Sequence, residues 1–369
     1  MRDWRTPLRP AWNWAWSMVG RAVRAWMHFR EHDKADMARR GQGDRRVAAL
    51  RPLAPGRFAI FATYPTFPLE GALLDMLRQL TARGVQLLVV ATTPPLPEDR
   101  ATLERFASAI IDIGNVGRDF GAYQQGLFHL RDTVGLDAVE RLVFLNDTLY
   151  FLSGRDPGPL LDGLLDERHD YVGANENFDK HYHVGSFCFA MSHRALNAPC
   201  FLRFWEAYMP YSTRVHAIDN GEVALTRTMM SAGIIPHVIY AWHHVADDVR
   251  AYLETPGRPL HMFCLGLRRT LLAGPSPFSE TLARDVAQYC QDHNQVHSLG
   301  FFFVRFRGMP YLKKDIVWNN IHLVSDLTSF VESDQLDDIE RVMVMVRQKG
   351  TQAARKKFMV KLKSRLQLI

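Results

Sequence analysis

The chain has 369 residues, of which 47% are hydrophobic and 23% charged. That balance is typical of a globular protein and excludes a disordered, collagen-like or low-complexity chain. The length predicts about two domains, or one large α/β domain with extensions. No uncharged apolar run is long enough to cross a bilayer and no cleavable leader stands at the start, so we expect neither a membrane-spanning helix nor export. The four widely spaced cysteines form no CxxC pair, which indicates reduced thiols of a cytoplasmic protein.

The net charge of +6 is distributed unevenly along the chain. Residues 1–46 carry eleven Lys or Arg against five acidic residues, and residues 347–369 carry eight and no acid. The two ends together hold +14, so the body between them holds −8. A protein that binds nucleic acid should carry its basic residues on the folded body. Because the body here is acidic, we expect no nucleic-acid partner.

The basic N-terminal extension, residues 1–46, contains a predicted amphipathic helix over residues 12–28. Its apolar face is rich in tryptophan and its other face carries Arg21 and Arg24; the apolar face comprises Trp12, Trp16, Val19, Val23, Trp26 and Met27. Such a face suits the interface of an anionic bilayer, where indole lies at headgroup depth. The alternative is a helix that packs on the protein's own core.

The body alternates short apolar strands with amphipathic helices. Residues 41–57, rich in Gly, Arg and Pro, are interpreted as a linker. Strands are expected at 58–63, 85–91, 109–113 and 141–145, and helices at 69–83, 98–107 and 121–132. Strands that are apolar throughout predict a parallel, Rossmann-type sheet with helices on both faces. After Tyr150 the alternation loosens, so residues 58–150 are expected to bind a nucleotide and residues 151–320 to complete a substrate pocket.

Two loops follow predicted strands and therefore lie at the carboxyl edge of the sheet, where ligands bind. The first contains Asn115, Gly117, Arg118 and Asp119. Its glycines would let the backbone approach a ligand, Arg118 would bind a phosphate and Asp119 would orient it. The alternative is a glycine turn with an Arg–Asp surface pair.

The second loop is Asn146-Asp147-Thr148. A carboxylate at a strand end, beside an amide and a hydroxyl, can hold a divalent ion and the diphosphate behind it, or merely cap a turn. A dinucleotide-dependent oxidoreductase is the weaker alternative, because Thr63-Tyr-Pro-Thr-Phe-Pro68 stands after the first strand in place of the glycine motif such an enzyme would have. Thr63 is assigned to donor binding.

The order strand, Arg-Asp loop, helix, strand and Asn-Asp is that of diphosphate-sugar transferases of the GT-A fold. The chain resembles the rhamnan synthesis protein F family, bacterial glycosyltransferases of cell-surface polysaccharide assembly. The resemblance covers roughly residues 58–320 and lies in NVGRDFGAYQQGL (115–127), RLVFLNDTLY (141–150), HVGSFCFAMSHRAL (183–196), FLRFWEAY (201–208), DNGEVALTRTMMSAG (219–233) and NQVHSLGFFFVRFRGMPYLKKDIV (294–317).

The resemblance implies transfer of a deoxyhexose, typically rhamnose, from a nucleotide-diphosphate donor to a lipid-linked glycan acceptor. Inverting transfer needs a carboxylate that deprotonates the acceptor. By analogy with GT-A enzymes we assign this role to Glu222, with Asp219 as its neighbour. The alternative is a capping box, with Asp219 as the N-cap and Glu222 as its partner.

A divalent metal, Mg²⁺ or Mn²⁺, is the expected cofactor, with Asp147 and His243 as ligands; histidines of such loops more often serve as hydrogen-bonding residues. Asn175, His183, Gly185 and Ser186 are assigned to the acceptor site, with a turn as the alternative. Lys313 and Lys314 are interpreted as a solvated face, although either can reach a diphosphate.

The helical C-terminal extension, residues 321–369, ends in a basic segment with apolar residues at helical spacing, namely Phe358, Leu362, Leu366 and Ile369. It is either a second membrane anchor or a solvated tail. Two basic amphipathic ends predict a cytoplasmic protein that binds the inner face of the cytoplasmic membrane. The alternative function is a non-catalytic module that binds nucleotide-sugar or glycan at the membrane.

Overall fold

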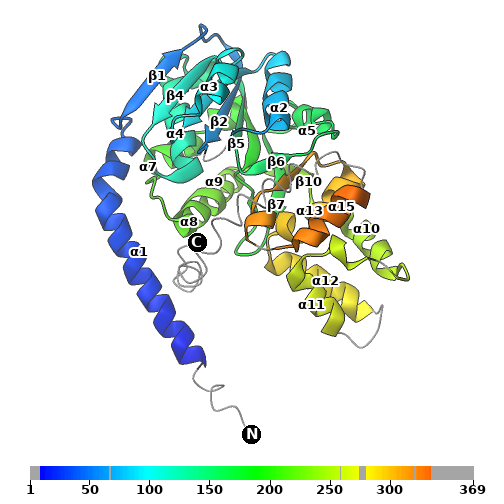
Figure 1. The fold of residues 1–369 in the computed structure, drawn as a ribbon. Helices are drawn as coiled ribbons and strands as arrows, with labels where there is room; N and C mark the ends of the chain where they lie inside the picture. Colours follow the sequence, from blue (N-terminus) through cyan, green and yellow to red (C-terminus); the bar gives the residue numbers. More distant parts are fainter. Residues whose placement is uncertain (1–8, 66–67, 258, 274–279, 320, 334–369) are drawn as a thin grey trace.

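The computed structural model describes residues 9–65, 68–257, 259–273, 280–319 and 321–333. A large mixed sheet forms its centre (Figure 1), with the strand order β1-β4-β3-β2-β5-β9-β7-β10 and β8 paired to β7. The strands are β1 (Arg45–Ala49), β2 (Gly56–Thr63), β3 (Gln86–Ala91), β4 (Ala109–Ile113), β5 (Val139–Asn146), β7 (Tyr171–Asn177), β8 (His183–Val184), β9 (Cys188–Ser192) and β10 (Pro236–Tyr240). A separate ribbon pairs β6 (Leu149–Phe151) with β11 (Tyr311–Lys313).

Strands β4, β3, β2 and β5 are parallel, as the uniformly apolar sequence predicted. In β2, Phe58, Ile60 and Ala62 belong to one apolar core, whereas Ala59 and Phe61 belong to the other. Because successive side chains of a strand point to opposite faces, both faces of the sheet are buried. The expected α/β sheet with helices on both faces is therefore confirmed.

Helices on the two faces complete these cores. On one side lie α4 (Arg118–Thr133), α6 (His193–Leu196), α7 (Pro199–Ala207) and α9 (Ala224–Ser231). On the other lie α2 (Gly71–Ala82), α5 (Gly158–Leu164), α10 (Trp242–Glu254), α11 (Leu265–Ala273), α12 (Glu280–Asp292), α13 (Gln295–Arg307) and α15 (Val324–Ser333). The remaining elements are α1 (Arg9–Arg39), α3 (Pro97–Glu104), α8 (Arg214–His216), α14 (Asp315–Trp318) and the short helices η1 (Leu136–Ala138), η2 (Ala217–Val223) and η3 (Leu260–Met262).

The linker prediction is wrong at residues 45–49, which form strand β1. This strand pairs antiparallel with β4 at the edge of the sheet, with Arg45 opposite Ile113 and Ala49 opposite Ala109. An edge strand is held by backbone hydrogen bonds and needs no apolar side chains, so its sequence carries no hydrophobic signal. Beyond residue 150 the chain returns to the same sheet, because β9 pairs antiparallel with both β5 and β7.

The long helix α1 runs along one side of the body and its N-terminal end projects past it (Figure 1). Its C-terminal part is docked: Ala35 and Ala38 are buried, and Gln125 of α4 donates a hydrogen bond to the Ala38 carbonyl. His28 stacks on Tyr211 with ring centroids 4.2 Å apart. Packing on the protein's own body, the alternative to a membrane face, therefore holds for this part of the helix.

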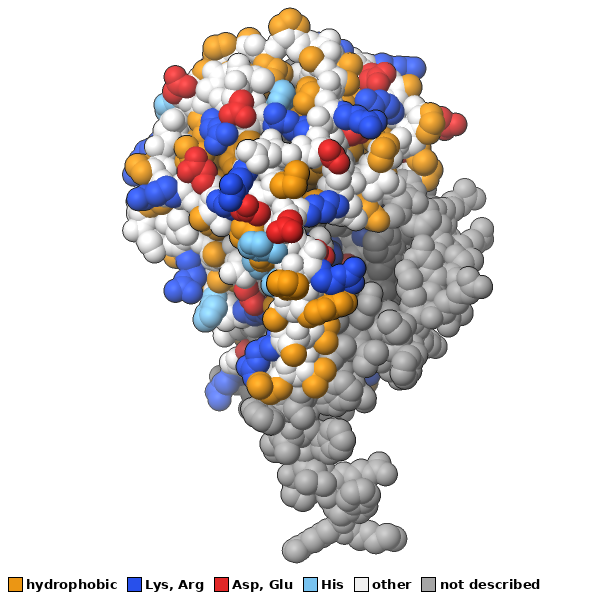
Figure 2. All heavy atoms as spheres, turned by 90° about the vertical axis from the view of Figure 1, so that its left-hand side faces the viewer, with side chains coloured by type: hydrophobic (Ala, Val, Ile, Leu, Met, Phe, Trp, Pro, Cys, Tyr) orange, Lys and Arg blue, Asp and Glu red, His pale blue; other side chains and the backbone are white. Residues whose placement is uncertain are grey.

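Further toward its N-terminus, α1 leaves apolar side chains uncovered. Trp26 is 57% and Phe29 81% exposed, and Met18 and Val19 are exposed beside them. Figure 2, which faces this side of the molecule, shows apolar side chains gathered on the projecting part of the helix. None of the described helices is long and apolar enough to cross a bilayer. The predicted basic tail, residues 347–369, lies outside the described residues.

Candidate active site

Two neighbouring parallel strands bring Thr63 and Asp147 together. Ala62 of β2 is opposite Asn146 of β5, so both chains leave the sheet at the same level. Asp147 Oδ2 accepts hydrogen bonds from Thr63 Oγ1 and from the backbone N–H of Tyr64, both at 2.8 Å. The carboxylate is thereby fixed at the carboxyl edge of the sheet, where parallel α/β proteins bind their ligands.

Asn146 joins this edge to the start of α4. Its Nδ2 donates to Asp119 Oδ2 at 2.7 Å, while its Oδ1 accepts from the Thr148 hydroxyl at 2.6 Å and from the Thr148 N–H at 3.1 Å. Asn146 itself is buried. The two loops that the sequence singled out therefore form one hydrogen-bonded unit.

The turn into α4 has unusual backbone geometry. Gly117 has φ +72° and Arg118 has φ +55°, which makes Arg118 the non-glycine residue with positive φ in the described chain. Such a conformation is strained for a side chain with a Cβ and is most often retained at functional sites. Arg118 is exposed, as is Asn115 before it, and among the described residues no hydrogen bond or ion pair engages the Arg118 guanidinium.

The structural reason for the glycine at 117 is different from the one expected. A Cβ there would lie 2.3 Å from Cβ of Pro210, and one at Gly121 would lie 2.0 Å from the Val116 carbonyl oxygen. The same holds at Gly185, where a Cβ would meet the Phe187 ring at 2.5 Å. Glycine is required at these positions because neighbouring parts of the chain pack against the backbone there. The close approach of a ligand, which the sequence analysis expected, is not the reason.

Asp119 is perturbed by its surroundings. Burial raises the pKa of Asp119 to about 6, opposed by the charges of Arg118 and Lys313 and reinforced by Asp147 and Glu222. These influences place both loops, Glu222 and Lys313 within electrostatic range of a single carboxylate. A carboxylate whose pKa is shifted by burial and by several named charges is typical of a functional site.

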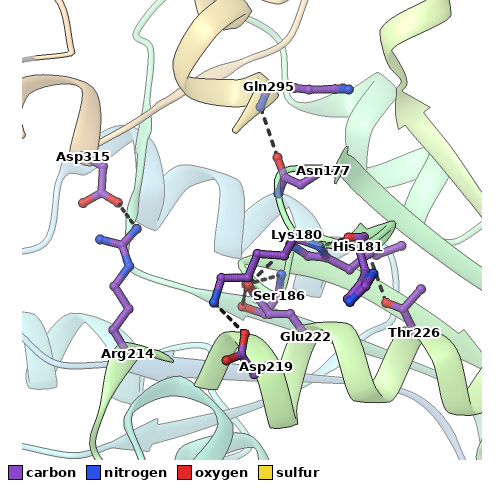
Figure 3. Close-up of polar contacts among 12 residues, drawn as sticks. Asn177, Lys180, His181, Ser186, Arg214, Asp219, Glu222, Thr226, Gln295 and Asp315 are labelled. Atoms are coloured by element: carbon purple, nitrogen blue, oxygen red, sulfur yellow. Dashed lines mark hydrogen bonds and ion pairs between the residues drawn. The ribbon is translucent and has the colours of Figure 1, made fainter. Parts of the chain in front are cut away.

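Glu222 lies across from this edge on η2, a π-helical segment between α8 and α9. Its Oε1 accepts hydrogen bonds from Ser186 Oγ at 2.5 Å and from Ser186 N–H at 3.1 Å (Figure 3). Its Oε2 is 3.7 Å from Nε2 of the buried His183. π-Helical insertions in α-helices are frequent at functional sites.

Asp219 does not share this environment. Its carboxylate forms an exposed ion pair with Lys180, 2.6 Å away, on the outer side of the helix (Figure 3). The capping-box alternative for Asp219 and Glu222 is wrong, because helical geometry begins at Arg214, with Thr213 as the N-cap residue. Both acidic residues therefore lie inside the helix, and the π-helical winding separates their directions.

Asn175 is engaged within the protein. The side chain is buried; its Nδ2 donates to the Tyr240 carbonyl at 3.3 Å and its Oδ1 accepts from the Tyr311 hydroxyl. His183 is also buried, with Nδ1 bonded to the His181 carbonyl at 2.7 Å. Of the residues assigned to the acceptor, Ser186 and His183 adjoin Glu222, whereas Asn175 and Gly185 support the strands behind it.

Lys313 enters the site from a distant part of the sequence, and its interpretation as a solvated face is wrong. Strand β11 pairs with β6, which places Lys313 opposite Leu149, just after the Asn146-Asp147 loop. Its Nζ lies 4.0 Å from the centre of the Phe187 ring. Burial lowers the pKa of Lys313, against the charges of Asp315, Glu222 and Asp119, which raise it. Lys314 points elsewhere and pairs with Glu70 at 2.8 Å.

Asp315, beside Lys313, is held by two other groups that the sequence did not single out. Nη2 of Arg214 lies 3.4 Å from its Oδ2 (Figure 3). Nε2 of His297 lies 3.6 Å from the same oxygen. Burial raises the pKa of Asp315, but the adjoining His297 and the charges of Lys313 and Arg214 outweigh it and lower the pKa overall.

The predicted metal ligands Asp147 and His243 are not joined. His243 is exposed on α10, its ring contacts His244, and nothing in the described part of the chain connects it to Asp147. The described residues contain no group of three His, Cys, Asp or Glu side chains suited to a metal ion. Asp147 and Asp119 use Oδ2 in the bonds above, which leaves Oδ1 of each for a cation that takes its other ligands from phosphate and water.

No model of a known protein family matches the sequence. A protein of Sinorhizobium fredii (strain NBRC 101917 / NGR234), described as the uncharacterized protein y4gN, is 28% identical over 216 residues. The match covers 55% of this chain and 55% of that protein, so the chain spans about half the length of this relative. The resemblance to the rhamnan synthesis protein F family therefore stays a prediction.

Among solved structures, the mannosyltransferase PcManGT from Pyrobaculum calidifontis, in complex with GDP-Man and Mn²⁺, aligns over 96% of both chains. The TM-score is 0.31 and the sequence identity 11%. At these values the alignment carries no conclusion about activity, which must rest on the site itself.

Proposed function

We propose that the chain is a glycosyltransferase that moves a sugar from a nucleotide-diphosphate donor to an acceptor hydroxyl with inversion. One observation carries the proposal: Thr63, Asp147, Asn146 and Asp119 form one hydrogen-bonded unit, and Glu222, Arg118 and Lys313 all lie within electrostatic range of its Asp119. The two cations, which have no counter-ion among the described residues, suit the binding of a diphosphate. The separate carboxylate of Glu222 suits the role of a general base.

On the donor side, Arg118 would bind the diphosphate and Asp119 would fix the donor's orientation. Asp147, held by Thr63 and the Tyr64 N–H, would hold a divalent cation, Mg²⁺ or Mn²⁺, with the phosphates. Such a cation neutralises the charge of the leaving group when it is bound. His243 has no part in this arrangement.

On the acceptor side, Glu222 would take the proton of the attacking hydroxyl. The acceptor oxygen forms a bond to the anomeric carbon, the bond from that carbon to the phosphate oxygen breaks, and the nucleoside diphosphate leaves with the electron pair. The Ser186 hydroxyl and N–H hold Glu222 Oε1, which leaves Oε2 for the proton. Because His183 Nδ1 faces a carbonyl, which only accepts, its Nε2 toward Glu222 carries no proton while the ring is neutral.

The finer identity follows the sequence resemblance: a deoxyhexose such as rhamnose as the sugar, and a lipid-linked glycan as the acceptor. The projecting part of α1 supports a membrane-bound acceptor. Its exposed Trp26 and Phe29 lie beside Arg30, whose guanidinium is 4.8 Å from the Trp26 ring centre. Apolar aromatic groups flanked by arginine suit the surface of an anionic membrane.

The test is donor turnover by the full chain. The chain is incubated with UDP-, GDP-, dTDP- and CDP-sugars, with and without Mn²⁺, and release of the nucleoside diphosphate is measured. A transferase releases it slowly in water, and the Glu222→Gln variant loses that release while it keeps donor binding. Binding without release by the wild-type protein would favour the non-catalytic module, and binding of none of the donors would contradict both.

A further inference from the structure

The charge of Lys313 lacks a direct counter-ion, although acidic side chains surround it. Among the described residues no carboxylate lies within ion-pair distance of its Nζ, whereas the adjacent Lys314 has Glu70 at 2.8 Å. Asp315, the nearest acidic residue in sequence, is already paired with Arg214. A half-buried ammonium costs free energy unless an anion completes its surroundings.

The fold holds Lys313 firmly in this position. Strand β11 fixes Lys313 opposite Leu149, and the Lys314 N–H donates to the Thr148 carbonyl at 3.0 Å. The Lys313 ammonium lies over Phe187, which directly follows the Ser186 that holds Glu222. Lys313 is therefore placed beside two residues that are close in sequence to the donor unit and to the partner of the proposed base, namely Leu149 and Phe187, and it is held there by a strand pairing.

A second cation, Arg118, acts on the same carboxylate as Lys313. The charges of both Arg118 and Lys313 act on Asp119, so both lie within electrostatic range of that carboxylate. Neither has a hydrogen bond or ion pair to another described residue. Two unpaired cations that share one neighbourhood are suited to an anion with two charged groups.

We propose that Lys313 binds the phosphate of the donor that leaves in the reaction, so that the leaving nucleoside diphosphate lies between the Lys313 ammonium and the Arg118 guanidinium. This inference rests on the proposed function and adds to it a binding residue that touches the leaving group. The ammonium stabilises the negative charge that develops on the phosphate oxygen when the bond to the sugar breaks.

The experiment compares Lys313→Met with Lys314→Met in the full chain. Methionine keeps the length of the side chain and removes the charge, and Lys314 is the matched control because it is adjacent and pairs with Glu70. Calorimetry measures binding of inorganic pyrophosphate, of the nucleoside diphosphate that the wild type binds, and of the matching nucleoside. We expect Lys313→Met to bind pyrophosphate and the nucleoside diphosphate with an affinity about 10- to 100-fold lower than that of the wild type. Nucleoside binding in this variant, and all binding by Lys314→Met, should stay within about twofold.

Thermal unfolding distinguishes a ligand-binding lysine from a structural one. Since Lys313 carries an uncompensated charge, Lys313→Met should have a Tm equal to or above that of the wild type. If the methionine variant does not fold, Lys313→Arg and Lys313→Gln take its place, with pyrophosphate binding retained in the first and lost in the second. Unchanged pyrophosphate affinity without the charge would overturn the inference and leave the proposed function standing. A wild-type chain that binds no nucleoside diphosphate would overturn both.

Discussion

The side-chain amide of Asn146 donates a hydrogen bond of 2.7 Å to Asp119 Oδ2. Its orientation is fixed, because the other end of the amide accepts from the Thr148 N–H, which can only donate. Asn146 therefore ties the carboxyl end of β5 to the start of α4. This relationship makes the two loops a single hydrogen-bonded unit.

Substitution of Asp147 tests the donor side of that site. Asp147→Asn keeps an oxygen that can accept from Thr63 and from the Tyr64 N–H, but it removes the negative charge. We expect turnover of the donor sugar to fall at least about 100-fold, and the Tm to stay within about 2 °C of the wild type because packing is unchanged. Donor hydrolysis and thermal unfolding measure the two effects. A large drop in Tm with a proportional loss of activity would make Asp147 a structural turn residue.

Substitution of Glu222 tests the base. Glu222→Gln keeps the shape of the side chain and an oxygen for the Ser186 hydrogen bonds, but it cannot take a proton. Turnover should fall by roughly 10²–10⁴-fold with donor affinity preserved, measured by single-turnover kinetics and calorimetry.

Asp219→Asn is the informative comparison for this prediction, because the sequence offered the two carboxylates as rivals. Asp219 pairs with Lys180 at the surface, so its loss should affect turnover far less than the loss of Glu222. Near-normal turnover of Glu222→Gln together with an inactive Asp219→Asn would transfer the role of base to Asp219.

The pH dependence of stability tests the environment of Asp119. Burial raises its pKa to about 6, so between about pH 4 and pH 6 the folded protein keeps a proton that the unfolded chain has released. The free energy of unfolding contributed by this group therefore falls as pH rises through that window, by at most about 3 kcal/mol.

Asp119→Asn has no such proton to lose. Its free energy of unfolding relative to the wild type should rise by about 1–3 kcal/mol between pH 4 and pH 7, measured by urea denaturation at each pH. Taking the difference between the two proteins removes the contribution of every other titrating group. A difference that does not change with pH would show that Asp119 titrates normally.

The exposed face of α1 is tested by sedimentation with vesicles. Trp26 and Phe29 project from the helix, whereas its docked face uses His28 and Ala35 against the body. The Trp26→Ser/Phe29→Ser double variant should lose roughly tenfold in affinity for vesicles containing phosphatidylglycerol at low salt, and binding by the wild type should weaken as salt is added.

Ile235→Ser is the matched control for α1, because Ile235 is 63% exposed on the body. Its vesicle binding should equal that of the wild type. If the intact chain does not sediment with anionic vesicles at low salt, the membrane interpretation is wrong and the face of α1 has another partner.

The elements of the sheet that depend on local pattern were predictable. Strand β4 was expected at 109–113 and is observed there, and the helices around it begin and end within a few residues of the expected positions. An apolar run bounded by turn residues can be recognised within the sequence that forms it. Because parallel strands bring their carboxyl ends to one edge, the place of both loops at that edge also followed from the sequence, whereas the hydrogen bond between Asn146 and Asp119 did not.

Other features depended on contacts between distant segments. The pairing of β1 with β4 uses backbone groups alone, which leave no signal in the side chains of residues 45–49. The π-helical winding that directs Glu222 to Ser186 and Asp219 to Lys180 is invisible to a pattern of ordinary helical spacing.

The sequence by itself determined the alternating α/β architecture, the two loops at the carboxyl edge and the amphipathic character of α1. It could do so because hydrophobic periodicity and turn residues act over a few neighbouring positions. Only the tertiary structure decided that Lys313 lies against Phe187 whereas Lys314 pairs with Glu70. The reason is the pairing of β11 with β6, which joins segments far apart in the chain and turns one lysine toward Phe187 and the other toward Glu70.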